Sequence, residues 1–316
     1  MTMLTRSETA RYLLEGDNYC LLTHRRPDGD TIGSAAALCL GLRSLGKKCF
    51  ILENSEVTPR FKWLHQDLTV KEPQEGATLV TVDVASPGML PEGFKKYLED
   101  IALRIDHHGA ATSFTKLELV DPDSASCAEL VWDVLENMEV VMDASLAEAV
   151  YVGISTDTGC FRFSNTTDHT FGVAALCARA GARIYELNQE LFENNSLGRL
   201  RIQAWIVEHL KLIGNGEFAI VAIPKAVERQ LALTEDDMDN ISNFPRTVAG
   251  VCMAATLREE GEGRCKLSVR AIPGYDATMI TTRFGGGGHK GAAGASFSCS
   301  LEEAAQLVEK AMLEMN

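Results

Sequence analysis

The sequence predicts an α/β protein with a parallel-sheet N-terminal domain and a smaller α/β domain after it. Over residues 1 to about 180, short runs rich in β-branched residues alternate with amphipathic helical stretches, the pattern of a largely parallel sheet. The pattern then changes to long helical segments followed by further strand-like runs. The chain has 316 residues, about twice the length of a typical single domain, which also favours two domains.

The predicted strands of the first half are Tyr19–Thr23, Lys48–Leu52, Thr78–Val84, Ile101–Ile105 and Lys116–Val120. The predicted helices are Ser34–Leu45, Ser126–Met138, Ser145–Ile154 and Asp168–Ala180. Gly46 follows the first of these helices and Gly181 the last, as expected of glycine C-caps. In the second half, strand-like runs cover Glu217–Ile223, Thr247–Leu257 and Cys265–Ala271, and an amphipathic helix covers Leu301–Leu313.

Composition and charge limit the class of partner. The chain is 46% hydrophobic with a mean hydropathy of -0.03, as in ordinary globular proteins. No apolar run reaches the ~20 residues of a membrane-spanning helix, and no secretory signal is expected. The nine cysteines never form CxxC and predict a reduced, cytoplasmic protein. The net charge of -14 argues against long duplex nucleic acid, which binds basic surfaces, but allows a small anionic ligand.

Four apolar elements each end in aspartate or histidine. These residues are His24, Asp28 and Asp30 in HRRPDGD, Asp83 in TLVTVDVA, Asp106, His107 and His108 in IALRIDHHG, and Asp157 in GISTDTG. Each cluster alone is also explained as a turn, a helix cap or a surface feature. Parallel strands, however, present their carboxyl ends on one rim. Carboxylates and imidazoles without thiolates suit a pair of Mn-, Fe- or Co-like ions, which would hold a water and the oxygens of a phosphate ester.

These motifs occur in a defined order along the chain. HRRPDGDTIGS, VTVD, DHH and STDTGCFRF, followed by GGGGHKGAAGA, resemble the motifs of the DHH phosphoesterase superfamily and its C-terminal DHHA1 domain. The resemblance covers the whole chain, and the layout is similar to that of bifunctional oligoribonucleases and pAp phosphatases (nanoRNases). It implies a DHH catalytic domain over 1–185, a linking helical region over 186–200 and a DHHA1 substrate-binding domain over 201–316. The active site is expected in the cleft between the domains.

The resemblance also implies a role for each site residue. Two divalent ions, with Mn²⁺ preferred, would be bound by His24, Asp28 and Asp83 and by Asp30, Asp83, His107 and Asp157. The catalytic residues would be His108, which contacts the scissile phosphate and protonates the leaving oxygen, and Asp106, which orients a histidine. The substrate would be bound by Arg270, Gly285, Gly286, Gly287, Gly288 and His289. Two positions depart from the pattern: Ala111 replaces an asparagine, and Cys127 a threonine.

The implied function is a metal-dependent phosphodiesterase that converts short oligoribonucleotides or dinucleotides to mononucleotides, with 3′-phosphatase activity on pAp. A homodimer is also implied. The alternatives are a cyclic-dinucleotide (c-di-AMP type) phosphodiesterase, a manganese pyrophosphatase, an exonuclease of the RecJ type and a non-catalytic dinucleotide sensor. GGGGHK argues against the pyrophosphatase, and the short acidic chain argues against the exonuclease. No GxGxxG follows the first strand, which excludes a Rossmann oxidoreductase.

Overall fold

The computed structural model describes residues 2–109, 112–261 and 263–315. The chain forms two compact units, Met1–Asn194 and Asn195–Asn316, and the division falls within the range 186–200 that the sequence assigns to a linking region. Among the described residues, no helix has both the length and the apolar character needed to cross a membrane.

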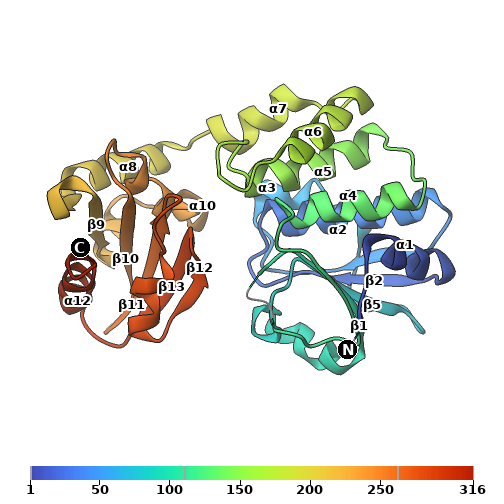
Figure 1. Ribbon diagram of the computed structural model, residues 1–316, viewed down its shortest axis with the longest axis horizontal. Helices are drawn as coiled ribbons and strands as arrows, with labels where there is room; N and C mark the ends of the chain where they lie inside the picture. Colours follow the sequence, from blue (N-terminus) through green and yellow to red (C-terminus); the bar gives the residue numbers. More distant parts are fainter. Residues whose placement is uncertain (1, 110–111, 262, 316) are drawn as a thin grey trace. The chain divides into compact units, whose positions relative to one another are not determined.

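Unit 1 contains a seven-stranded sheet of order β1-β7-β6-β5-β2-β3-β4, and its neighbouring strands pair in parallel (Figure 1). The strands are β1 (Thr2–Met3), β2 (Tyr19–Leu22), β3 (Cys49–Leu52), β4 (Thr69–Val70), β5 (Thr78–Val82), β6 (Ile101–Asp106) and β7 (Leu117–Val120). The helices are α1 (Arg6–Glu15), α2 (Gly29–Ser44), α3 (Pro59–Lys62), α4 (Cys127–Asn137), α5 (Ala144–Asp157), α6 (Asp168–Ala180) and α7 (Ile184–Asn188). A π-helix, η4, covers Gln189–Glu193. The predicted α/β class and parallel sheet are confirmed.

Both faces of this sheet are covered. Leu21, Val80 and Leu103 belong to one core with residues of α1, α2, α4 and α5, and Figure 1 shows α2, α4 and α5 along that face. Their strand neighbours, such as Leu22, belong to a second core with Phe94 of the 3-10 segment η3 (Glu92–Asp100). Burial on both faces explains why these strands read as continuous apolar runs instead of alternating.

The strand order reverses between β2 and β5. From β2 the chain passes to β3 and β4 on one side of the sheet, and then returns to β5 and β6 on the other. In open α/β sheets, ligands bind beyond the carboxyl ends of the strands at such a switch point. The segments that follow β2 and β5 are therefore the expected place for a site, and they contain His24 to Asp30 and Asp83.

Two elements differ most from their predicted bounds. The helix predicted from Ser34 begins at Gly29, because the Asp28 side chain accepts the Thr31 N–H (3.1 Å) and caps it. The strand predicted over Thr247–Leu257 is observed as β10 (Met253–Gly261), because the residues before it form a 3-10 turn over Pro245–Thr247. The sequence analysis also missed α1, whose start is fixed by a capping box between Thr5 and Glu8.

Unit 2 contains a six-stranded mixed sheet of order β12-β13-β11-β10-β9-β8. The strands are β8 (Lys211–Ile213), β9 (Phe218–Ile223), β10, β11 (Arg264–Ala271), β12 (Gly287–His289) and β13 (Ala292–Phe297), and only β9 and β10 pair in parallel among the described strands. The helices are α8 (Leu197–His209), α9 (Lys225–Gln230), α10 (Glu235–Met238), α11 (Thr278–Thr281) and α12 (Leu301–Leu313). Val308 and Met312 of α12 share a core with the strands, while Ile202 and Ile206 of α8 belong to a separate core with Val221.

Two glycines allow α2, α4 and α5 to approach closely beneath the strand ends. A Cβ at Gly33 of α2 would lie 2.5 Å from the Ala149 carbonyl oxygen of α5. A Cβ at Gly153 of α5 would lie 2.2 Å from the Ala128 side chain of α4 and 3.0 Å from Asp30 Oδ1. Close helix packing thus brings the start of α2, which contains Asp30, next to the start of α4.

The packing predicts that Gly33→Ala destabilises the protein by about 1–3 kcal/mol, the usual cost of overpacking, because the contacted atoms are backbone. Calorimetry should show a lower melting temperature for the variant. Gly172→Ala is the control: Gly172 is exposed on α6 with no atom within 4 Å of the added Cβ, so this variant should be neutral or up to ~1 kcal/mol more stable. Equal melting temperatures for the two variants would contradict the close-packing account.

Candidate metal centre

Asp83 lies at the centre of the polar cluster. It follows β5 with φ of 58°, a left-handed conformation that is uncommon for residues other than glycine and is often found at functional sites. Its side chain is buried, with the residue 2% exposed. Oδ2 accepts a hydrogen bond from the Thr31 hydroxyl (2.7 Å), whereas Oδ1 accepts none within the described chain. A buried carboxylate oxygen with no hydrogen bond needs a partner of another kind.

The first group of metal-ligand type consists of His24, Asp28 and Asp83. His24 Nε2 lies 3.6 Å from Asp83 and 4.0 Å from Asp28. The other ring nitrogen, Nδ1, contacts the Arg25 carbonyl oxygen (2.7 Å), and the Asn54 amide donates to the His24 carbonyl (2.9 Å), so the ring is fixed with Nε2 toward the carboxylates. Burial lowers the pKa of His24, but the interaction with Asp83 and the charge of Asp28 raise it to about 9.

The second group consists of Asp30, His107 and Asp157. His107 Nε2 lies 3.6 Å from Asp30, 3.7 Å from Asp157 and 3.6 Å from Asp83. Its Nδ1 contacts the Ser124 carbonyl oxygen at 3.3 Å, so the same nitrogen faces all three carboxylates. Burial lowers the pKa of His107, but the charges of Asp30 and Asp157 raise it to about 9.

Asp30 has a further set of contacts that the sequence analysis did not predict. Its carboxylate accepts the Cys127 N–H (2.8 Å) and the Ala128 N–H (2.9 Å) at the first turn of α4, where helix amides and the dipole favour an anion. The contact from position 127 is made by the backbone, so the departure from threonine leaves it in place. The other departure, Ala111, lies outside the described residues.

A third group joins Asp83 and His107 to His108. His108 Nδ1 lies 3.6 Å from Asp83 Oδ1, but the same nitrogen is hydrogen-bonded to Asp106 Oδ1 at 2.7 Å. The bond to Asp106 therefore occupies the His108 nitrogen that lies nearest to Asp83.

The donor set fits divalent cations. Burial and the neighbouring charge of Asp83 raise the pKa of Asp30 well above its ordinary value, and burial raises the pKa of Asp157 to about 7. Asp157 also ends α5, where the helix dipole disfavours an anion. The carboxylates therefore repel one another and are neutralised by protons on His107 and His24. Cations bound at these ligands would replace those protons and satisfy the orphaned Asp83 oxygen.

The predicted substrate residues lie in unit 2, on neighbouring strands. Arg270 of β11 pairs with Ala292 of β13, which in turn pairs with His289 of β12, so Arg270 and His289 occupy one row of the sheet. Arg270 donates from Nε to Asn243 (2.7 Å), and no ion pair joins it to a carboxylate among the described residues. Burial and the charge of Arg246 lower the pKa of Arg270. An added anion would be favoured beside this half-buried guanidinium, which no described carboxylate neutralises.

The four glycines before His289 have different surroundings. Gly286 and Gly288 lie against β13, where a Cβ would meet backbone oxygens at 2.1 and 2.6 Å. Gly285 has φ of 71° and ends a 3-10 turn. Gly287 is exposed, and a Cβ there would contact nothing within 4 Å. Close packing against β13 explains why Gly286 and Gly288 are glycines, and the left-handed backbone explains Gly285. No atom of the described chain would obstruct a ligand that approached the backbone at Gly287.

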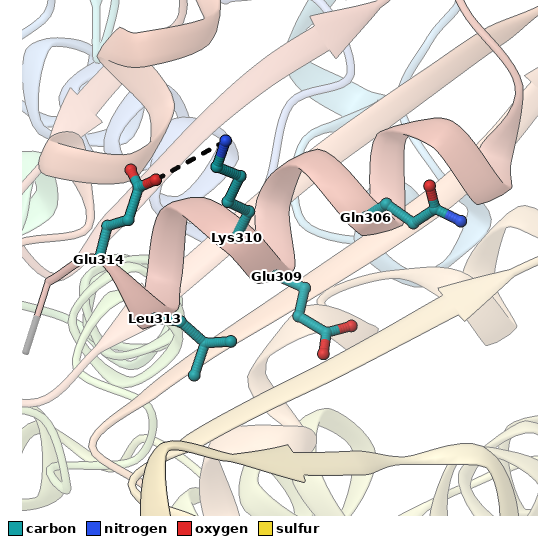
Figure 2. Close-up of a pocket in the computed structure, with 5 residues that line it drawn as sticks. All are labelled: Gln306, Glu309, Lys310, Leu313 and Glu314. Atoms are coloured by element: carbon teal, nitrogen blue, oxygen red, sulfur yellow. Dashed lines mark ion pairs between the residues drawn. The ribbon is translucent and has the colours of Figure 1, made fainter.

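A surface hollow elsewhere does not contain these residues. Figure 2 shows an open hollow along α12, lined by Gln306, Glu309, Lys310, Leu313 and Glu314. None of the predicted metal, catalytic or substrate residues lines it, and its polar groups include the ion pair of Lys310 with Glu314. The His/Asp cluster at the strand ends is therefore the candidate site.

Comparison with known proteins defines the class. The DHH family N-terminal domain matches residues 18–154, and the DHHA1 domain matches residues 217–314. The chain belongs to the DHH family, and the resemblance predicted from the sequence motifs is confirmed.

Individual relatives cover nearly the whole chain. The bifunctional oligoribonuclease and PAP phosphatase NrnA of Thermus thermophilus is 35% identical, over 95% of this chain and 90% of the relative. The protein of the same name from Bacillus subtilis is 27% identical, over 92% and 93%. An exopolyphosphatase-related protein from Bacteroides fragilis has a similar structure, with a TM-score of 0.87 at 22% identity over 98% of this chain and 96% of that chain, which shows the shared fold.

The position of Asp83 between the metal-ligand groups yields a prediction. Asp83→Ala should abolish turnover and lower bound metal more than any other single substitution, because two groups would lose the same ligand. Asp83→Asn, which tolerates the left-handed backbone and keeps the side-chain shape, should also lose metal. Bound metal is measured by elemental analysis after dialysis against manganese.

Asp121→Asn is the matched control for this prediction. Asp121 also follows a parallel strand, but its carboxylate pairs with Arg6 at 2.7 Å. Full metal occupancy and a normal rate in either Asp83 variant would refute the shared-ligand assignment.

Proposed function

We propose that this chain is a metal-dependent phosphodiesterase that hydrolyses short oligoribonucleotides and dinucleotides to mononucleotides and also removes the 3′-phosphate of pAp. The proposal rests on one observation above all: His/Asp groups that share Asp83 and His107 lie at the sheet's switch point. It is supported by the 35% identity, over 95% of the chain, to a bifunctional oligoribonuclease and PAP phosphatase. The reduced cysteines favour action in the cytoplasm, and the family resemblance favours a homodimer.

Two divalent ions fit the donor set, and Mn²⁺ is the ion we expect, because the ligands are carboxylate oxygens and imidazole nitrogens without thiolate. The residues that would hold them are His24, Asp28 and Asp83 for one ion, and Asp30, Asp83, His107 and Asp157 for the other. When bound, such cations neutralise phosphate oxygens and lower the pKa of a water molecule into the physiological range.

His108 is proposed as the acid that protonates the leaving oxygen. The hydrogen bond between His108 Nδ1 and Asp106 orients the ring, and Nε2 is proposed as the nitrogen that acts on the substrate. Burial lowers the pKa of His108, but the bond to Asp106 and the charge of Asp83 raise it above its ordinary value. A protonated ring is the form that an acid requires.

Unit 2 is proposed to bind the part of the nucleotide that does not react. Arg270 offers a guanidinium that no described carboxylate neutralises, and a guanidinium binds phosphate through two parallel hydrogen bonds. His289 shares its row of the sheet, and the backbone at Gly287 is open to close approach by an anion. Arg270, Gly285, Gly286, Gly287, Gly288 and His289 thus form the proposed nucleotide-binding set.

A turnover panel tests the function. Purified protein is incubated with pAp, a linear dinucleotide, a five-nucleotide RNA, c-di-AMP or pyrophosphate, each with Mn²⁺, Mg²⁺ or Co²⁺. We expect Mn²⁺-dependent conversion of the dinucleotide to mononucleotides and of pAp to AMP. Faster cleavage of c-di-AMP or of pyrophosphate would contradict the proposal, and saturable dinucleotide binding without turnover would make the protein a sensor.

The role of His108 predicts that His108→Ala retains its metal content but loses rate by roughly 10²–10⁴-fold, the contribution of a positioned acid. Steady-state rates on a dinucleotide and elemental analysis of the same sample check both parts. His169→Ala is the control, since His169 is bonded to Asp133 on α4 and has no proposed role. Metal loss in His108→Ala would instead make His108 a ligand, as its place in the third group allows.

The role of Arg270 predicts a substrate-dependent loss. Arg270→Ala should hydrolyse a small aryl phosphodiester about as well as wild type, but lose roughly ten- to two-hundredfold in kcat/KM on a dinucleotide, corresponding to an arginine–phosphate contact of ~1.5–3 kcal/mol. Arg264→Ala, at the exposed start of the same strand, is the control. Equal losses of kcat/KM on both substrates would mean that Arg270 acts at the metal centre. Unchanged kcat/KM on both would mean that Arg270 does not bind the substrate.

A further inference from the structure

A buried arginine lies two residues before the DHH motif. Arg104 belongs to β6, and its side chain is 1% exposed. Because side chains alternate along a strand, Arg104 and Asp106 lie on the same face of the sheet. The parallel register pairs Arg104 with Glu118 of β7. A charge in the middle of a buried strand is costly unless it is paired, so this arginine requires an explanation.

The contacts of Arg104 connect it to the proposed acid. Its NH2 group lies 3.4 Å from Asp106 Oδ2, a fully buried oxygen that accepts no hydrogen bond within the described chain. The other oxygen of Asp106 is bonded to His108 Nδ1 at 2.7 Å. Asp106 therefore lies between the Arg104 guanidinium and the His108 ring, and the charge of Arg104 favours the position of the carboxylate in which it is bonded to His108.

Arg104 also fixes the segment that follows the motif. Its NH1 group donates to the Thr112 carbonyl at 2.8 Å and lies 3.8 Å from Glu118 Oε1. Glu118 in turn accepts the Phe114 N–H (3.0 Å) and the Ser113 hydroxyl (3.1 Å). One guanidinium thus connects the carboxylate behind His108 with residues 112–115 and with the neighbouring strand.

We propose that Arg104 is a positioning residue for the hydrolytic reaction: it fixes Asp106 so that Asp106 holds His108 in the orientation in which Nε2 delivers a proton to the leaving oxygen. This inference rests on the proposed function. A merely structural ion pair would affect stability and all substrates alike. A positioning role acts through the proton donor, so it affects the reactions that need the proton.

The test uses two esters with the same phosphoryl part, thymidine 5′-phenyl phosphate and thymidine 5′-p-nitrophenyl phosphate. Phenolate needs protonation to leave, whereas p-nitrophenolate, the anion of a much stronger acid, does not. Arg104→Lys keeps the charge, but a single ammonium cannot contact both Asp106 and the Thr112 carbonyl. We expect kcat on the phenyl ester to fall about 10–100-fold with KM nearly unchanged, a small change on the p-nitrophenyl ester, and full manganese content.

Two further variants keep the test decisive. Arg6→Lys is the matched control, because Arg6 also joins two carboxylates of unit 1, those of Asp121 and Asp133, and it should retain wild-type rates on both esters. Glu118→Gln removes the negative charge beside Arg104. It should also lower kcat on the phenyl ester more than on the p-nitrophenyl ester, but by a smaller factor. This variant tests the proposal if Arg104→Lys does not fold.

Equal rate losses on both esters, loss of manganese or unchanged rates would overturn the positioning role. If the wild-type protein cleaves the esters but not a dinucleotide, the proposed function fails, and the ester comparison still tests Arg104.

Discussion

The structure of unit 1 depends on one electrostatic constraint: two buried aspartates, Asp30 and Asp83, and the partly exposed Asp157 converge on His107 Nε2 within 3.6–3.7 Å. Carboxylates placed this close repel one another, and burial adds the cost of lost solvation. Protonated imidazoles and the first amides of α4 offset part of this cost. Divalent cations bound at the proposed ligands would supply the remaining compensation.

Each proposed metal ligand is held in place by a different local interaction or backbone conformation. A backbone carbonyl orients the His24 ring, the left-handed backbone turns Asp83 at the end of β5, and helix amides hold Asp30. The close packing at Gly153 brings the supporting helices together. Because these contacts belong to separate elements, the site depends on how the parallel sheet brings its strand ends and helices together. Arg104 is proposed to do the same for the proton donor, through its contact with Asp106.

Much of the fold could be predicted from the sequence. The terminal helix Leu301–Leu313 is observed with its predicted bounds, and α6 ends at Gly181 with the left-handed C-cap that its glycine indicated. The convergence of His24, Asp83 and His107 followed from the parallel topology of the strands that precede them, whereas Asp157 ends a helix. Long-range contacts could not be predicted. The hydrogen bond from the Cys127 N–H of α4 to Asp30 joins residues 97 positions apart. In the sequence, Arg104 is a single charged residue in an apolar run, and its partner Glu118 is identified only by the strand register.

We propose that Asp83 belongs to two metal sites at once. Electron paramagnetic resonance of the protein titrated with Mn²⁺ tests it most directly, because two manganese ions that share a carboxylate are exchange-coupled. If Asp83 is a shared ligand, the protein should bind two manganese ions per chain and give a coupled multiline signal, and this signal should disappear in Asp83→Asn. A single bound ion with an uncoupled six-line spectrum, unchanged in that variant, would contradict it.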